Sequence, residues 1–282
     1  MPDKGLIPYH YLPNNKVEYL QGDEGTLHFL KKINFDDYFT KFFNISEDYT
    51  IEEFCNFNYE WDEYGFIKSK LNPPSIDNTP HEVWCFGDSF TMGTGVPSNR
   101  AWPAVLQEYT NQKVINFGVG GSGPETTLRL LSNWLKYSKY KPANIFIYGF
   151  FSGRFEVQEN LDYMHVLSSE FADKCNMYPG QKKQMKHKML NIDTFYTKWN
   201  KNIDELIFSN NIKYHKLDIN ELNDWRYGDA ISWGRDLLPK EWSRHEIFKS
   251  FHLPYYEFTD LMVVHPGINH HKFIAKEFSK RL

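Results

Sequence analysis

The chain has few cysteines, no long apolar run and no visible signal-peptide pattern, and each of these absences argues against a class of protein. Its three cysteines, Cys55, Cys85 and Cys175, are too widely spaced for a disulfide framework or a Cys-x-x-Cys metal site. No stretch approaches the roughly 20 apolar residues of a membrane span, and the N-terminus lacks the basic and apolar regions of a signal peptide. We therefore expect no membrane partner, and a cytoplasmic location, or a virion-associated one if the source is viral.

The chain also lacks a charge excess. It carries 32 basic and 36 acidic residues, which gives a formal net charge of -4 over 282 residues. Proteins that bind nucleic acids usually present a concentrated basic surface. We therefore expect no nucleic-acid partner. The sequence indicates no cofactor and does not predict an oligomeric state.

Residues 1–80 differ in composition from the rest of the chain. They include acidic and aromatic stretches and end in "LNPPSIDNTP", which is rich in residues that break helices and strands. We predict that 1–80 form an N-terminal extension and linker, and that 81–282 form the main domain.

Within the main domain, apolar strands alternate with helices. Strands are predicted at 83–87, 113–117 and 144–151, with helices at 98–110, capped by Ser98 or Asn99, and at 124–139. A helix at 193–211, a strand at 212–219 and a closing helix at 268–282 follow, and 220–264 are predicted to be a long aromatic loop region. This alternation predicts an α/β domain with a parallel sheet and helices on its faces.

A Gly-Asp-Ser turn follows the first of these strands, in "VWCFGDSFTMGTGV". Ser89 is either a turn residue or a nucleophile, because Gly, Asp and Ser all favour turns. We expect Asp88 to fix the turn as a hydrogen-bond acceptor. Ligands of open parallel sheets bind at the carboxyl ends of the strands, so Ser89 lies where a site is expected.

The glycine cluster "GVGGSG" at 118–123 follows the next strand and has two interpretations. It satisfies the Gly-x-Gly-x-x-Gly pattern of dinucleotide-binding proteins, but the next strand carries no carboxylate that could bind a ribose. Alternatively, glycine lets a backbone N–H face a substrate oxyanion. Gly121 or a neighbouring residue is the candidate donor.

A histidine block, "VVHPGINHHKFIA", lies near the C-terminus. His265 is the candidate general base for Ser89, because imidazole accepts and returns a proton near neutral pH. His270 and His271 are adjacent on a predicted helix and point in different directions, and no third ligand is evident, so no metal site is expected.

The blocks "FGDSFTMGTGV", "VINFGVGGSG" and "HPGINHHKFIA" resemble, in order and spacing, those of the SGNH (GDSL) hydrolase family. The resemblance implies a flavodoxin-like three-layer α/β/α fold with a parallel sheet of about five strands. It also implies that Ser89 is the nucleophile and its N–H an oxyanion donor, that Gly121 supplies the second N–H, and that His265 is the base. His271 is implied to be a structural partner in the last helix.

The chain departs from the family pattern at two places. The family usually has an aspartate three residues before the histidine, where this chain has Met262. Asp260 is the candidate orienting acid, with Glu257, a backbone carbonyl or no group at all as alternatives. The family's third block carries an asparagine that donates to the oxyanion, and here "GFFSGRFEV" offers Ser152 at that place, or Arg154 as a longer-reaching substitute.

The resemblance implies a serine ester hydrolase that removes acyl groups, with acetyl as the first expectation, from a carbohydrate or another small ester through an acyl-enzyme on Ser89. An O-acyltransferase that uses the same residues is one alternative. A non-catalytic carbohydrate-binding or structural protein of this fold is the other, because of the changes at Met262 and Ser152.

Overall fold

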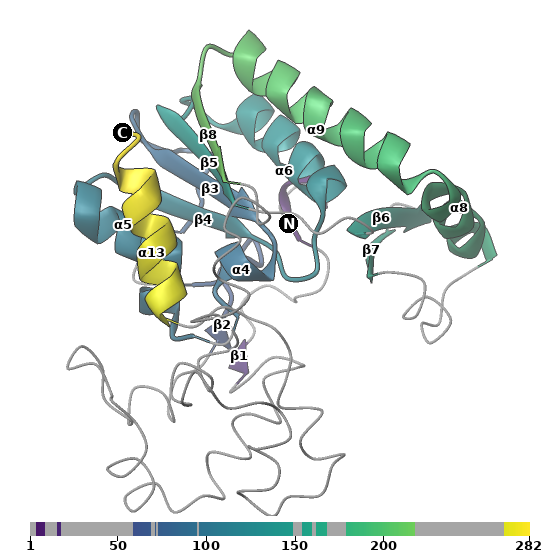
Figure 1. The fold of residues 1–282 in the computed structure, drawn as a ribbon, viewed down its shortest axis with the longest axis horizontal. Coiled ribbons are helices and arrows are strands. Elements are labelled where there is room, and N and C mark those ends of the chain that lie inside the picture. The colour runs from purple at the N-terminus through teal and green to yellow at the C-terminus, as the bar shows by residue number, and fades with distance from the viewer. Residues whose placement is uncertain are drawn as a thin grey trace, which may run out of the picture.

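A parallel sheet of four strands forms the centre of the molecule (Figure 1). In spatial order the strands are β4 (Val114–Gly118), β3 (Val83–Gly87), β5 (Asn144–Tyr148) and β8 (Lys213–Leu217). The structure is a computed structural model that describes residues 4–8, 16–17, 59–68, 71, 73–94, 96–148, 154–159, 162–167, 179–217 and 268–282. Because β3 pairs with both β4 and β5, Gly87 lies in register with Gly118 on one side and Tyr148 on the other.

Strands β3, β4 and β5 are buried along their whole length, and their side chains alternate between two cores. One core contains Trp84 and Phe86 of β3, and the other contains Val83 and Cys85. Helices therefore cover both faces of the sheet, and the predicted three-layer α/β/α arrangement is confirmed.

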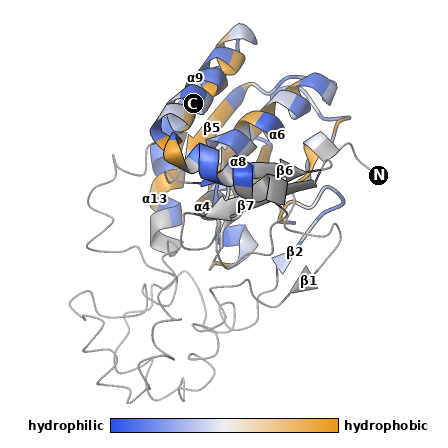
Figure 2. Ribbon diagram, turned by 90° about the vertical axis from the view of Figure 1, so that its right-hand side faces the viewer, coloured by the Kyte–Doolittle hydropathy of each residue, from blue (hydrophilic) through white to orange (hydrophobic). Residues whose placement is uncertain are grey.

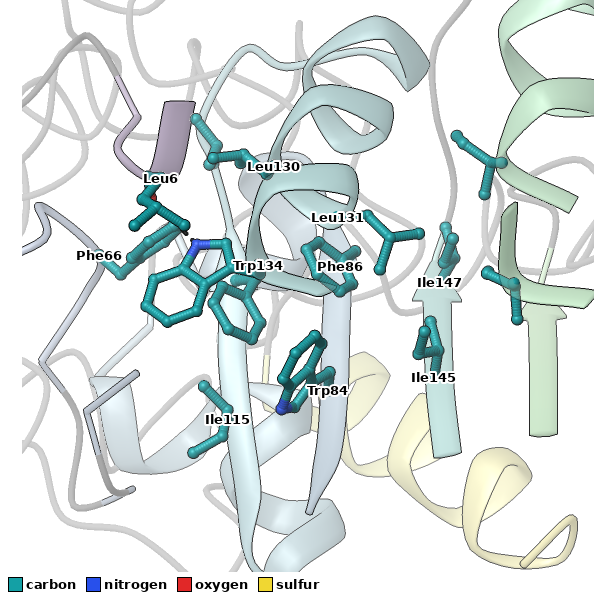
Figure 3. Packing of buried hydrophobic residues seen from close by; sticks show 14 of the residues in the cluster. Leu6, Phe66, Trp84, Phe86, Ile115, Leu130, Leu131, Trp134, Ile145 and Ile147 are labelled. Atoms are coloured by element: carbon teal, nitrogen blue, oxygen red, sulfur yellow. Dashed lines mark hydrogen bonds between the residues drawn. The ribbon is translucent and has the colours of Figure 1, made fainter. Parts of the chain in front are cut away.

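The first core lies under α6 (Pro124–Tyr137) and α9 (Ile192–Ser209). Residues of α6 that recur at helical spacing, Leu130, Leu131 and Trp134, face the sheet (Figure 3). The Trp134 indole N–H donates to the carbonyl of Leu6 at 3.0 Å, which fixes the N-terminal turn η1 (Lys4–Leu6) against α6.

The second core lies under α5 (Trp102–Thr110) and α13 (Ile268–Ser279). Trp102 of α5 packs against Phe278 of α13, with ring centroids 4.9 Å apart. In the hydropathy colouring of Figure 2, α13 carries both hydrophobic and hydrophilic residues, as expected for a helix with one face on the sheet and one face outside. In the described part of the chain, no helix has the length and apolar character that crossing a membrane requires.

Smaller elements surround the sandwich. They are the short antiparallel pair β1 (Lys16–Val17) and β2 (Tyr59–Glu60), the 3-10 turn η2 (Ser98–Arg100), the four-residue helix α4 (Ser89–Met92), the hairpin β6 (Arg154–Glu159) and β7 (Asp162–Leu167), and the helix α8 (Pro179–Leu190). The hairpin and α8 lie together at one side of the molecule (Figure 1). Neither was expected from the sequence.

Parts of the predicted N-terminal extension belong to the core of the sheet domain. Leu6, Tyr64 and Phe66 are buried in the first core, and the Phe66 ring meets Phe117 of β4 edge-on at 5.2 Å. The division at residue 80 stays a prediction. The aromatic loop region 220–264 lies outside the described residues.

The secondary-structure predictions hold for the strands and differ in detail for one helix. The segment 98–110 is a 3-10 turn followed by α5, whose cap is Ala101, so the predicted cap at Ser98 or Asn99 is wrong. The reason is tertiary: the N–H of Trp102 donates to Nδ1 of His271 at 3.1 Å, and Pro103 has no N–H to satisfy. Four parallel strands are described where about five were expected, and a fifth is not among the described residues.

Candidate active site

Ser89 is the first residue of α4, directly after the carboxyl end of the central strand β3. Its side chain is nearly buried, with 4% of the residue exposed. The carbonyl of Ser89 accepts the N–H of Gly93 and of Thr94 at 3.0 Å each, which closes the short helix behind it. The serine therefore lies where the sequence predicted, at the carboxyl ends of the strands, the edge at which open parallel sheets generally bind ligands.

Asp88 caps this helix. Its Oδ1 accepts the N–H of Phe90 at 2.9 Å, and its carbonyl accepts the N–H of Thr91 and of Met92. The predicted turn-fixing role of Asp88 is confirmed by these bonds. The carboxylate has a second partner that the sequence did not indicate: Nη1 of Arg154 donates to Oδ2 at 2.6 Å.

Burial dominates the electrostatics of this turn. Asp88 is 1% exposed, and burial raises the pKa of its carboxyl, while the guanidinium of Arg154 and the N–H of Phe90 oppose that rise. The arginine is thus the cation that makes a buried carboxylate beside Ser89 tolerable.

The glycine-rich loop between β4 and α6 is attached to the same turn. The carbonyl of Gly87 accepts the hydroxyl of Ser122 at 3.1 Å and the N–H of Val119 at 3.0 Å. Gly121, in the middle of this loop, has a φ of 73°, a left-handed conformation that favours glycine. Among the described residues, neither the N–H of Gly121 nor that of Ser89 has a hydrogen-bond acceptor. Two N–H donors therefore lie on adjoining loops at one edge of the sheet.

Two glycines of the cluster face the protein itself. A Cβ on Gly118 would lie 2.2 Å from the backbone nitrogen of Met92 in α4, and a Cβ on Gly123 would lie 2.2 Å from the carbonyl oxygen of Arg154. Asn116 adds a side-chain link, because its Nδ2 donates to the carbonyl of Thr91 at 3.0 Å. The loop, α4 and the start of β6 are thus packed backbone against backbone, which explains the glycines without a nucleotide.

A chain of hydrogen bonds joins the beginning of α13 to α4. His271 is fully buried and accepts the N–H of Trp102, and the Trp102 indole N–H donates to Oγ1 of Thr91 at 3.3 Å. His271 therefore has the structural place that the resemblance implied. His265, six positions earlier, lies outside the described residues, as do Asp260, Glu257, Met262 and Ser152.

The structure brings three of the predicted site residues into one neighbourhood: Ser89, Gly121 and Arg154. Sequence reasoning missed the pairing of Arg154 with Asp88, because the two residues are 66 positions apart and no local pattern joins them. No group of three or more metal-binding side chains occurs in the described part of the chain.

No protein-family model and no curated protein matches the chain. Solved structures with a similar arrangement include a member of the lipolytic protein G-D-S-L family from Veillonella parvula DSM 2008. It is 15% identical, with a TM-score of 0.34, over 72% of this chain and 100% of that chain.

Two esterases are similar to the same degree. The psychrotrophic esterase EstA from Pseudoalteromonas sp. is 12% identical over 71% of this chain and 95% of that chain, with a TM-score of 0.31. A family two carbohydrate esterase from Clostridium thermocellum, solved with cellohexaose, is 10% identical over 77% of this chain and 66% of that chain, with a TM-score of 0.32. Activity depends on the side chains of the site and not on the arrangement of the strands and helices.

Proposed function

We propose that this protein is a serine ester hydrolase with Ser89 as its nucleophile. The observation that carries the proposal is the geometry of the Gly-Asp-Ser turn: Asp88 fixes Ser89 at the start of α4, and the Gly121 loop is bonded to the same turn through Gly87. A nucleophilic serine needs such a fixed position and nearby N–H donors for the oxyanion.

In the proposed reaction, His265 takes the proton of the Ser89 hydroxyl while Oγ bonds to the ester carbonyl carbon. The N–H groups of Ser89 and Gly121 donate to the oxyanion that forms. When the tetrahedral intermediate collapses, the C–O bond to the alcohol breaks and His265 returns the proton to that oxygen. Water then attacks the acyl-enzyme by the same sequence and releases the acid.

The position of His265 in this scheme is supported by the docking of α13. The helix begins at Ile268, three residues after His265, and its first turn is bonded through His271 to Trp102, which is bonded to Thr91 of α4. We propose Asp260 as the group that orients His265, and Ser152 as a third oxyanion donor.

The proposed substrate class is an O-acetylated carbohydrate or a similar small ester. The support is the aromatic content of 220–264, which includes Trp225, Trp233 and Trp242, because aromatic rings pack well against sugar and acyl surfaces.

The test is hydrolysis of a neutral aryl acetate by wild type, Ser89→Ala and His265→Ala. We expect each substitution to lower kcat/KM by about 1000-fold or more. Ser98→Ala is the matched control, because Ser98 lies in η2 of the same domain and is expected to keep full activity. A fluorophosphonate should label wild type on Ser89 and leave Ser89→Ala unlabelled.

Equal activity in wild type and Ser89→Ala refutes the proposal, and so does a folded wild type that neither hydrolyses esters nor reacts with the probe. Adding sugar acceptors separates hydrolase from acyltransferase: a hydrolase gives free acetate in their presence, and a transferase gives the acetylated sugar.

A further inference from the structure

We propose that Arg154 is a positioning residue of the Ser89 site, which holds the nucleophile's turn in place through the carboxylate of Asp88. The inference rests on the proposed function, because the position of Ser89 affects a rate only if Ser89 reacts. It assigns Arg154 a different task from the oxyanion contact that the sequence suggested for it.

Both carboxylate oxygens of Asp88 are used within the site. Oδ1 accepts the N–H of Phe90, and Oδ2 accepts Nη1 of Arg154 at 2.6 Å, a short, charge-assisted bond. Because Asp88 is almost completely buried, removing the arginine leaves a charged carboxylate without a cation. That carboxylate is adjacent to Ser89 and caps its helix, so any movement of it is transmitted to the nucleophile.

Arg154 is itself fixed at its backbone. It begins β6, and its carbonyl lies where a Cβ on Gly123 would come within 2.2 Å, so the strand touches the glycine-rich loop directly. The side chain is only 18% exposed. The guanidinium therefore reaches Asp88 from a strand whose backbone lies directly against the glycine-rich loop.

Two residues further along β6, a buried ionic network holds the strand. The carboxylate of Glu156 accepts hydrogen bonds from Nη2 of Arg129 at 2.8 Å and from its Nε at 3.0 Å. The backbone N–H of Glu156 donates to the carboxylate of Glu125 at 2.8 Å. Lys188 of α8 donates to Glu125 at 2.6 Å and to the carbonyl of Glu156 at 2.6 Å. These contacts tie β6 to α6 and α8, and they set the direction from which Arg154 approaches the turn.

This arrangement separates positioning from substrate binding. One N–H of Arg154 is committed to Asp88, whose negative charge offsets that of the guanidinium. Loss of Arg154 should therefore lower the rate of attack by Ser89 on a neutral ester, with little effect on the binding of that ester. A residue that bound an anionic substrate would instead change KM, and only for charged substrates.

The experiment compares wild type with Arg154→Met on a neutral aryl acetate. We expect kcat to fall by about 10- to 100-fold with KM changed by less than about 2-fold, because small misplacements of a reacting group have effects of this size. Labelling of Ser89 by a small fluorophosphonate should slow by a similar factor. Arg154→Lys should recover part of both losses, because it restores a cation near Oδ2 but not the reach of the guanidinium.

A double-mutant cycle tests whether the two residues act as a unit. Asp88→Asn alone should also lower kcat, and the double variant Arg154→Met/Asp88→Asn should lose no more than the worse single variant. Lys201→Met is the matched control, since Lys201 pairs with Glu205 on the exposed face of α9 and should leave activity unchanged. A thermal melt of each variant separates loss of position from loss of fold, and Arg154→Lys and Asp88→Asn serve if Arg154→Met does not fold.

The outcomes are distinguishable. An active wild type with unchanged kcat and labelling in Arg154→Met overturns the positioning role and leaves the proposed function intact. A loss confined to KM, or losses that multiply in the double variant, also overturns it. A wild type that neither hydrolyses esters nor labels refutes the proposed function and this inference together.

Discussion

Asp62 is a buried carboxylate whose conversion to an amide should stabilise the protein at neutral pH. Only 6% of the residue is exposed, and Oδ1 accepts the N–H of Tyr64 at 2.9 Å and of Phe66 at 3.0 Å. Among the described residues, Oδ2 has no hydrogen-bond partner. Burial raises the pKa of Asp62 to about 6, against the opposing effect of these backbone N–H groups.

The sign and the size of the effect follow from this shift. Because the pKa of Asp62 rises from 3.8 in the unfolded chain to about 6 in the folded one, the folded state binds the proton more tightly. The stabilisation that comes from the proton bound to Asp62 is complete below pH 4 and is lost as the pH rises through about 6. A shift of about two pKa units corresponds to about 3 kcal/mol of unfolding free energy, which is an upper value for one site.

Denaturant unfolding of wild type and Asp62→Asn between pH 4 and pH 8 measures the effect. The asparagine keeps the Oδ1 acceptor and cannot ionise, so its advantage over wild type should grow by about 2 to 3 kcal/mol across this range. Asp77→Asn is the matched control, because Asp77 is exposed, and its difference from wild type should stay within about 0.5 kcal/mol. If wild type and Asp62→Asn lose stability in parallel with rising pH, Asp62 is not a buried acid with a raised pKa.

Two further predictions concern stability. Gly118→Ala should lower the free energy of unfolding by about 3 kcal/mol, because the added Cβ would lie 2.2 Å from the backbone nitrogen of Met92. If the denaturant concentration at the unfolding midpoint does not fall, α4 does not pack closely on β4. For Glu82, burial raises the pKa, but the Lys113 ammonium at 2.8 Å and the N–H groups of Thr79 and Trp84 outweigh burial and lower it. The contribution of ionised Glu82 to stability should therefore be present above pH 4.5 and be lost on acidification. Glu82→Gln should have a lower unfolding free energy than wild type at pH 7, and this difference should shrink below pH 4. A difference that does not change with pH would contradict this.

The central strands could be predicted from the sequence because burial on both faces leaves a plain local signal. The run at 83–87 is apolar along its length, since alternate side chains enter two different cores. The position of Ser89 followed from the same signal, because residues after a parallel strand lie at the ligand-binding edge of the sheet.

The hairpin β6–β7 and the helix α8 could not be predicted in the same way. Helix α8 has no apolar stripe at helical spacing, and its Lys188 is held by Glu125 and the carbonyl of Glu156. Contacts with residues far away in the chain hold α8 in place, so no window of sequence contains the cause of its position. The same holds for the bond from the N–H of Trp102, at the start of α5, to His271 and for the pairing of Asp88 with Arg154.

The bonds between the N-terminal turn and α6 constrain the order in which the chain acquires its native contacts. Nη1 of Arg129 donates to the carbonyl of Gly5 at 2.9 Å, and Trp134 donates to that of Leu6, across separations of 124 and 128 residues. During synthesis, Gly5 and Leu6 therefore cannot form these two bonds until Arg129 and Trp134 have been added to the chain. Such long-range closures slow folding, so we expect the docking of η1 on α6 to be one of the later steps of folding.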